Sequence, residues 1–398
     1  MITVAEAYRI VLEHTKSYIL EEAYLTDTLG LVLAETIVAD RDFPPYDRVT
    51  MDGIAIRYDH FAKGQSIFEI ESVAAAGSPR LILQQRQNAI EVMTGASLPV
   101  GVDTVVRYED LKIEAKRANL QIDTLQQGQN IHHKGSDRSH GDILIKPGAI
   151  INAAAVAIAA TVGKSKLSVR MLPSVAILST GDELVEIDQK PESHQIRTSN
   201  SYTIQAALKN LRVESQRYHV HDNQAGLEHK LQEIFNQHDI VIISGGVSKG
   251  KFDFVPAALK AVGVEKKFHR VKQRPGKPFW FGTSPEGKTV FALPGNPVSS
   301  YMCTIRYILP YLRKCLGLEP LTIKQVILSE DITFKPTLLY MLPIKLENTP
   351  GGFDMAHPLK GNGSGDFANL IHTDGFLELD AVGRNDFKKG EVHSFWES

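Results

Sequence analysis

The sequence DIVIISGGVSKGKFD (residues 239–253) decides the fold of the central part of the chain. Four consecutive β-branched residues, 240–243, precede a pair of glycines, which is typical of a strand buried on both faces. SVAILST (174–180) and TVFALPG (289–295) repeat this pattern, and helical periodicity is present at about 199–211, 224–236, 254–262 and 297–316. Strands that alternate with amphipathic helices predict βαβ crossovers and a mainly parallel α/β sheet with helices on both faces.

The regions before and after this α/β segment have a different pattern of apolar and turn residues. Short apolar runs separated by Gly, Pro and Asn turns predict a small all-β unit at about 50–137, and a β-rich tail follows residue 320. The start of the chain and the segment after residue 137 contain helices and short strands, so the β unit is interpreted as an insertion into one scaffold. We therefore expect a scaffold or linker domain (1–46 with 138–172), an inserted β domain (47–137), an α/β domain (173–317) and a β-barrel-like C-terminal domain (318–398).

Composition excludes several classes of protein. The chain has 398 residues, a net charge of −2 and 43% hydrophobic residues, which is typical of a globular protein and favours neither disorder nor a nucleic-acid partner. No apolar run reaches the length of a membrane span, and the start is read as a helix instead of a signal peptide, so a cytoplasmic protein is expected. Cys303 and Cys315 lie about 18 Å apart along one predicted helix, which excludes a disulfide between them.

The loops after three predicted parallel strands form the candidate ligand site, because ligands of open α/β sheets bind at the carboxyl ends of strands. Gly245 and Gly246 follow one strand, and glycines there let backbone N–H groups approach a phosphate. The spacing matches neither GxxxxGK[ST] nor GxGxxG. The alternative is a tight turn that needs glycine for a positive φ. The candidate substrate-binding residues are Thr180, Gly181, Asp182, Ser244, Gly245, Gly246, Ser248, Pro294, Gly295, Asn296 and Pro297.

A run of basic residues follows the α/β helices, namely Lys266, Lys267, His269, Arg270, Lys272, Arg274 and Lys277. FHRVKQ (268–273) is predicted as one strand, with Arg270, Lys272 and Arg274 on one face and His269, Val271 and Gln273 on the other, so that one edge of the cleft is basic. For Lys266 and Lys267 a solvated edge strand protected by charge is an equal alternative. The proline and glycine of RPGK (274–277) predict a turn that holds Arg274 and Lys277 at a defined position.

Carboxylates stand beside turn glycines or at strand ends, namely Asp52, Asp137, Asp182, Glu183, Asp222 and Asp253. Acidic side chains beside a phosphate site act through a divalent cation, and Mg²⁺ is commonly held by one or two carboxylates together with substrate phosphates. The pattern therefore predicts a phosphate ester handled with Mg²⁺. For any single aspartate, helix capping or an Asx turn is an equal alternative.

Several motifs in order along the chain resemble one family, the molybdopterin molybdenumtransferases, which include MoeA and the gephyrin E domain. The motifs are PPYDRVTMDGIAI (44–56), EVMTGASLPVGVDTVVRYED (91–110), GQNIHHKGSD (128–137), GDILIKPG (141–148), AILSTGDEL (176–184), SNS (199–201), DIVIISGGVSKGKFD (239–253), RPGKP (274–278), LPGNPVSSY (293–301) and GNGSGDFANL (361–370). The resemblance implies an enzyme that removes AMP from adenylylated molybdopterin in a Mg²⁺-dependent step and inserts molybdenum from molybdate into the dithiolene. It also implies a homodimer, with the molybdopterin adenylyltransferase and apo molybdoenzymes as candidate partners.

The resemblance also assigns expected roles to residues. The acidic active-site positions correspond to Asp52, Asp137, Glu183, Asp222 and Asp253, of which Asp222 and Asp253 are the expected Mg²⁺ ligands. The positions that gather cations and hydroxyls for molybdate correspond to Arg274, Lys277, Ser299 and Ser364.

The chain departs from the family pattern at a few positions, and alternatives follow from them. Lys251 stands where a carboxylate is common, and Leu342 lies near the place of a basic residue in the tail strand. One alternative is therefore a divergent, non-catalytic paralogue or a scaffold. Another is a nucleotide pyrophosphatase that shares only the α/β domain.

Overall fold

The computed structural model describes residues 1–247, 254–321, 323–349, 352, 354–359, 361, 363 and 365–398. These residues form two compact units. Unit 1 consists of Met1–Ala34, Gly148–Ala153 and Lys166–Ser398, and unit 2 consists of Glu35–Pro147 and Ala154–Ser165. Within the described ranges, no helix is both long enough and apolar enough to cross a membrane.

The centre of unit 1 is a six-stranded sheet with the strand order β16-β13-β17-β21-β20-β18. The strands are β13 (Val175–Thr180), β16 (Ser215–Val220), β17 (Ile240–Ser244), β18 (Glu265–His269), β20 (Trp280–Thr283) and β21 (Thr289–Leu293). Strands β16, β13, β17 and β21 are parallel, whereas β20 pairs antiparallel with both β21 and β18. The predicted mainly parallel sheet is therefore confirmed, and the register pairs Ser244 with both Ser179 and Leu293 at its carboxyl edge.

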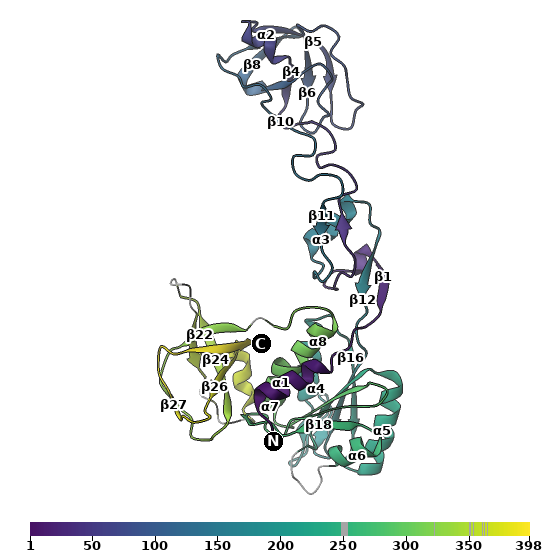
Figure 1. The fold of residues 1–398 in the computed structure, drawn as a ribbon, viewed down its shortest axis with the longest axis vertical. Helices are drawn as coiled ribbons and strands as arrows, with labels where there is room; N and C mark the ends of the chain where they lie inside the picture. Colours follow the sequence, from purple (N-terminus) through teal and green to yellow (C-terminus); the bar gives the residue numbers. More distant parts are fainter. Residues whose placement is uncertain are drawn as a thin grey trace. The chain divides into compact units, whose positions relative to one another are not determined.

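Helices cover both faces of this sheet because alternate strand residues are apolar on each side (Figure 1). Ile240 and Ile242 belong to the cluster on one face, and Val241 and Ile243 to the cluster on the other. The helices are α1 (Val4–Glu13), α4 (Asn200–Lys209), α7 (Pro297–Cys303) and α8 (Leu309–Cys315) on the first face, and α5 (Gln224–Gln237) and α6 (Val255–Ala261) on the second.

The predicted long helix at 297–316 is continuous but not uniform. Between α7 and α8 lies a π-helical segment, η3 (Thr304–Ile308), whose five residues are all buried. Cys303 and Cys315 are free and buried in this helical run, as expected.

The tail of the chain forms a closed five-stranded barrel, which confirms the predicted β-barrel-like domain. Strand β24 pairs with both β25 and β26, and this double pairing closes the ring β24-β25-β22-β28-β26. The strands are β22 (Lys324–Leu328), β24 (Leu339–Glu347), β25 (Met355–Pro358), β26 (Gly375–Asp380) and β28 (Val392–Glu397), with the pair β23 (Ile332–Thr333) and β27 (Asp386–Phe387) and the 3-10 helix η4 (Phe367–His372) beside them.

The single strand predicted for residues 268–273 is wrong. Strand β18 ends at His269, and Arg270 adopts a left-handed backbone with φ of 74°. The chain then leaves the α/β sheet, and β19 (Gln273–Arg274) pairs in parallel with β24 of the barrel. The alternation of faces stops at Arg270 because the two halves of the segment belong to different sheets.

Two further strands of unit 1 form an antiparallel ribbon, β1 (Leu20–Tyr24) with β12 (Lys166–Arg170). A short parallel pair, β14 (Leu184–Val185) with β15 (Ile196–Arg197), follows strand β13, and the 3-10 helix η1 (Leu25–Asp27) follows β1.

Unit 2 contains the expected inserted β structure, a six-stranded sheet with the order β7-β4-β6-β5-β9-β8. Its strands are β4 (Gly53–Ile56), β5 (Ile67–Ala74), β6 (Ala89–Val92), β7 (Thr104–Arg107), β8 (Leu111–Glu114) and β9 (Arg117–Leu120). The pairs β3 (Arg48–Val49) with β10 (Ile131–His132) and β2 (Ile37–Val38) with β11 (Ile143–Ile145) and the helical segments α2 (Tyr58–Ala62), η2 (Tyr108–Asp110) and α3 (Ala153–Thr161) complete the elements. The boundaries of the four predicted domains stay a prediction.

Candidate active site

The loops after β13, β17 and β21 lie together because these strands are parallel neighbours. The Asn200 side-chain amide, at the start of α4, donates to Ser244 Oγ at 2.9 Å and to the Gly295 carbonyl at 2.7 Å. The Gly245 N–H donates to the Leu293 carbonyl at 3.1 Å. These contacts join loops that are far apart in the sequence, so many of the predicted substrate-binding residues share one edge of the sheet.

The two glycines after β17 are required by their close approach to Thr180. Gly245 and Gly246 have φ of 105° and 67°, and a Cβ on Gly245 would lie 2.7 Å from the Thr180 carbonyl oxygen. A Cβ on Gly246 would lie 2.6 Å from a methyl carbon of Val255. Thr180 Oγ1 is buried and has no hydrogen-bond partner in the part of the chain that the structure describes. The turn therefore needs glycine for steric reasons, and it covers the Thr180 hydroxyl.

Carboxylates gather beside this turn. Asp182 Oδ1 accepts hydrogen bonds from the Asp222 N–H at 3.1 Å and lies 3.0 Å from His221 Nδ1. The Glu183 carboxylate packs against Gly181, where a Cβ would lie 2.5 Å from Glu183 Oε2. Asp222 also lines a small hollow together with Thr180, His221, Asn223, Leu227, Gly246, Phe254 and Val255. Ser248, Lys251 and Asp253 lie outside the described residues.

The donor set at this edge fits Mg²⁺ only in combination with a substrate. Among the described residues, no group of three or more His, Cys, Asp or Glu side chains is arranged to hold a metal ion. Mg²⁺ prefers oxygen ligands and usually binds through one or two carboxylates plus substrate phosphates. Asp182 and Glu183 supply such oxygens after β13, and Asp222 supplies them after the neighbouring strand β16.

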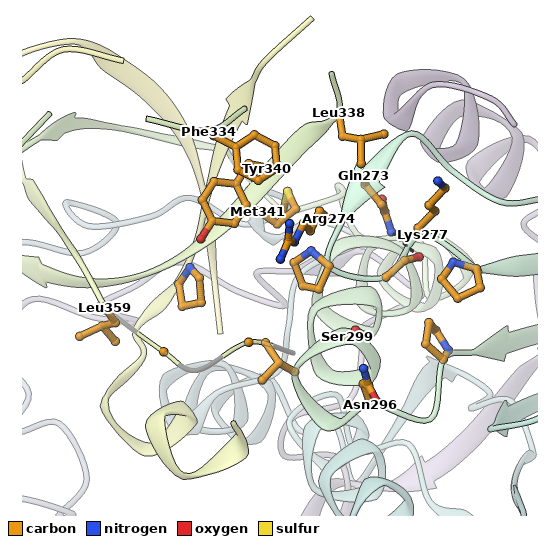
Figure 2. A pocket seen from close by; sticks show the side chains of 18 of the residues that line it. Gln273, Arg274, Lys277, Asn296, Ser299, Phe334, Leu338, Tyr340, Met341 and Leu359 are labelled. Atoms are coloured by element: carbon orange, nitrogen blue, oxygen red, sulfur yellow. Dashed lines mark hydrogen bonds between the residues drawn. The ribbon is translucent and has the colours of Figure 1, made fainter. Parts of the chain in front are cut away.

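A cavity of about 750 Å³ lies between the α/β sheet and the barrel, both in unit 1. Arg274, Lys277 and Ser299 line it together with 294–296, as Figure 2 shows. Its opposite wall is mostly apolar and comes from the barrel region, with Phe334, Leu338, Tyr340, Met341 and Leu359. We call this space the main cavity. Ser364, the fourth predicted molybdate residue, lies outside the described residues.

The position of Arg274 follows from the pairing of β19 with the barrel. Arg274 lies opposite Tyr340 in the parallel register, and the Tyr340 ring stacks on Phe334 with centroids 4.3 Å apart. Burial raises the pKa of Tyr340, while the positive charge of Arg274 partly opposes this rise. The cation and the aromatic pair are therefore neighbours where the two walls of the main cavity adjoin.

The basic run is divided by the structure. Arg274 and Lys277 line the main cavity, whereas Lys266 and Lys267 lie in the edge strand β18, where Lys267 Nζ pairs with Glu265 at 2.8 Å. For these two lysines the edge-strand alternative describes the geometry. Leu342 is buried in the barrel core, and its neighbour Met341 lines the cavity instead.

The remaining predicted carboxylates, Asp52 and Asp137, belong to unit 2. The N–H and the hydroxyl of Thr94 donate to Asp52 Oδ1 at 2.6 and 2.7 Å, and these hydrogen bonds lower the pKa of Asp52. Asp137 Oδ1 lies 2.9 Å from His132 Nε2, and Arg48 lies 3.1 Å from His132 Nδ1. Each carboxylate is therefore held by a short local network within its own unit.

Sequence reasoning missed two residues that organise the site. Asn200 joins two strand-end loops, and its only signal is a polar residue in the first turn of a helix within the SNS motif. Gln273 is fully buried beside Arg274 and bonds to the RPGK turn through its side chain. No local pattern distinguishes a buried glutamine from an exposed one, so Gln273 gave no signal.

Comparison with known proteins gives matches along almost the whole chain. Residues 2–163 match the MoeA N-terminal region (domain I and II), residues 176–314 a probable molybdopterin binding domain, and residues 325–397 the MoeA C-terminal region (domain IV). The curated molybdopterin molybdenumtransferase of Synechocystis sp. is 38% identical over 400 residues, which covers 100% of each chain. The protein of the same name from Staphylococcus epidermidis is 33% identical and covers 92% of this chain and 88% of its own.

A solved structure supports the same assignment. The molybdopterin biosynthesis MoeA protein from Pyrococcus horikoshii superposes with a TM-score of 0.85 at 28% identity, over 100% of this chain and 99% of that one. The alternative in which only the α/β domain is shared is wrong, because these matches also include both flanking regions. The chain therefore belongs to the MoeA family of molybdopterin molybdenumtransferases, as its motifs predicted.

Proposed function

We propose that this protein inserts molybdenum from molybdate into the dithiolene of adenylylated molybdopterin, with Mg²⁺-dependent release of AMP. The observation that carries the proposal is the main cavity, where Arg274, Lys277 and Ser299 face one space beside the carboxyl edge of the α/β sheet. The name of the curated relatives supports the same reaction class.

The cavity suits a doubly charged oxyanion for electrostatic reasons. Molybdate carries two negative charges, and a guanidinium and an ammonium on one wall supply two positive charges with directed N–H donors. Ser299 is buried near them and adds a hydroxyl. The apolar wall formed by Phe334, Tyr340 and Met341 lowers the local dielectric constant, which strengthens these attractions.

The strand-end loops are assigned to the phosphate part of the substrate. We assign the main chain of the turns after β13 and β17, at Gly181 and Gly246, to the phosphate oxygens, because glycine lets the backbone approach an anion closely. Asp222 and Asp253 would hold Mg²⁺, with Asp182 beside Asp222. Bound there, Mg²⁺ would neutralise charge on the phosphoanhydride. Cleavage of the phosphoanhydride by water releases AMP, and a role of Asp52 and Asp137 in positioning it stays an expectation of the family resemblance.

A homodimer is part of the proposal. Large apolar side chains are exposed on and beside the β1/β12 ribbon of unit 1, and Ile19 and Tyr24 are 73% and 63% exposed. The others are Leu20, Leu29, Ile150 and Met171. Exposed apolar side chains gathered on and beside one ribbon are expected where a subunit interface buries them. We assign this surface to a second copy of the chain. The molybdopterin adenylyltransferase, for substrate delivery, and apo molybdoenzymes, for product transfer, remain candidate partners. Sedimentation velocity of the wild type and of Ile19→Lys tests the dimer, which the charged variant should weaken.

The deciding experiment measures AMP release and reconstitution of an apo molybdoenzyme from adenylylated molybdopterin, Mg²⁺ and molybdate. Lys277→Met should raise the molybdate concentration needed for half-maximal reconstitution at least tenfold. Lys267→Met is the matched control, because that lysine pairs with Glu265 on an edge strand, and it should behave as the wild type. Asp222→Asn should remove Mg²⁺-dependent AMP release.

The possible results separate the alternatives. Tight substrate binding without AMP release or reconstitution would identify a degenerate paralogue or a scaffold. Equal effects of Lys277→Met and Lys267→Met would remove the main cavity from the molybdate assignment.

A further inference from the structure

A buried polar side chain, that of Gln273, is hydrogen bonded to the RPGK turn (residues 274–277). Gln273 has no solvent exposure, and its Nε2 donates to the Gly276 carbonyl at 3.1 Å and lies 3.6 Å from Cys303 Sγ. The Phe279 N–H donates to the same Gly276 carbonyl at 3.2 Å. One carbonyl at the centre of the turn is therefore fixed by the chain on both of its sides.

The turn also packs directly against this glutamine. Gly276 has a φ of 83°, and a Cβ there would lie 2.8 Å from Cys303 Sγ and 2.9 Å from Gln273 Nε2. There is consequently no space for the turn to move toward the helix while Gln273 keeps its position. Movement in the other direction would cost the buried hydrogen bond of the glutamine amide.

Gln273 is itself fixed by the π-helical segment η3. The Tyr307 hydroxyl donates to Gln273 Oε1, and burial raises the pKa of Tyr307, so the phenol keeps the proton that it donates. The centroid of the Tyr307 ring lies 4.7 Å from that of Phe279, which follows the turn in the sequence. Because π-helical segments often occur at functional sites, the location of Tyr307 in η3 is consistent with a role beyond packing.

We infer that the hydrogen-bonded pair of Gln273 and Tyr307 is a positioning device for Arg274 and Lys277, which keeps both cations at the wall of the main cavity ready for a tetrahedral oxyanion. Cations on a fixed turn lose less conformational entropy on binding than cations on a mobile one. The inference rests on the proposed function for the identity of the anion as molybdate. The geometry of the turn does not depend on that identity.

Tyr307→Phe tests the inference, because it removes one oxygen atom and keeps the ring. Tyr311→Phe is a matched control on the same helical run. The Tyr311 hydroxyl is also buried and hydrogen bonded, to Thr289 Oγ1 at 2.8 Å, but Tyr311 does not contact the turn in the described structure. If both hydroxyls served only the stability of the core, the two variants would lower the melting temperature and change nothing else.

The readouts are calorimetric titration with molybdate alone and hydrogen exchange of the Phe279 amide. We expect Tyr307→Phe to weaken molybdate binding about five- to tenfold and to speed this exchange, whereas Tyr311→Phe leaves both at the wild-type level. Gln273→Leu should weaken binding at least as much, because it removes the hydrogen bond to the Gly276 carbonyl as well as the one from Tyr307. Tyr307→Phe should add little in the Gln273→Leu background, where its hydroxyl has no partner left on residue 273.

The outcomes that overturn the inference are distinct from a failure of the proposed function. Equal molybdate affinity and equal Phe279 exchange in the two tyrosine variants would overturn it. If the wild type does not bind molybdate, the proposed function fails, and the exchange data alone decide the inference. Faster exchange in Tyr307→Phe than in Tyr311→Phe then supports the positioning role, and equal exchange refutes it.

Discussion

Replacing Arg306 with methionine tests how the barrel is attached to the α/β domain within unit 1. Arg306 is only 4% exposed and lies in η3. Its guanidinium carbon lies 3.8 Å from the centroid of the Trp396 ring and 4.4 Å from that of Tyr8, and its NH2 group lies 3.6 Å from Glu378 Oε1. Trp396 Nε1 donates to the other Glu378 oxygen at 2.6 Å. One cation therefore contacts α1, β26 and β28.

The magnitude follows from opposing contributions to the free energy of unfolding. Removing one partner of a buried ion pair costs about 3–5 kcal/mol. The lost cation–π contact with Trp396 adds about 2 kcal/mol, because the site is desolvated. In the opposite direction, Nε and NH1 of Arg306 are buried and have no hydrogen-bond partner among the described residues. Methionine removes both groups, and removing each unsatisfied donor gains about 1–3 kcal/mol. Methionine keeps most of the volume, so we expect a net loss of about 2 kcal/mol.

The assay is urea unfolding followed by tryptophan fluorescence. The chain has two tryptophans, so Trp280→Phe leaves Trp396 as the single reporter at the ion pair. Arg9→Met is the matched control, because Arg9 is exposed and pairs with Glu13 on the surface of α1, and it should cost less than about 0.5 kcal/mol. If Arg306→Met unfolds at the urea midpoint of Arg9→Met or above it, desolvation of the guanidinium outweighs its attractions and the reasoning is refuted.

Three further predictions concern the α/β domain. Gly246→Ala should lower the free energy of unfolding by at least about 2 kcal/mol, because the new Cβ would clash with Val255 and the residue has a positive φ. Gly263→Ala is the control, because Gly263 has a similar φ with open space around it, and it should cost only about 1 kcal/mol. Thermal unfolding of the two variants measures the difference. Asn200→Ala should cost about 1–2 kcal/mol and accelerate amide exchange at the ends of β17 and β21. Burial lowers the pKa of His238, so its stabilising contribution is present above its unfolded pKa of about 6.5 and is lost as the pH falls through the folded value. His238→Gln should flatten stability between pH 7 and 5, and an unchanged pH profile would contradict this.

Much of the fold follows from local patterns in the sequence. The buried runs at 175–180, 240–244 and 289–293 and the helical periodicity between them predict the parallel sheet, because these patterns report how often a side chain meets the core. Turn residues and short alternating runs likewise predict the inserted β unit and the β tail. The prediction failed at 268–273, where the chain changes sheets at Arg270. Alternation assigns faces within a sheet, but it contains no information about which sheet a residue joins.

The candidate site, like the fold, was predictable from the sequence only in part. Motif order indicated the family, the strand pattern indicated the strand-end loops, and the RPGK turn indicated the cations Arg274 and Lys277. Only the tertiary structure showed that Lys266 and Lys267 stand apart from the cavity and that Gln273 bonds to Tyr307, 34 residues further along the chain. A buried polar side chain is stabilised by a partner that the fold brings to it, and neither residue carries a sign of the other in its own neighbourhood. Sequence by itself therefore determined the elements and the chemistry available to them, and the tertiary structure decided which of those groups face one cavity and what holds them there.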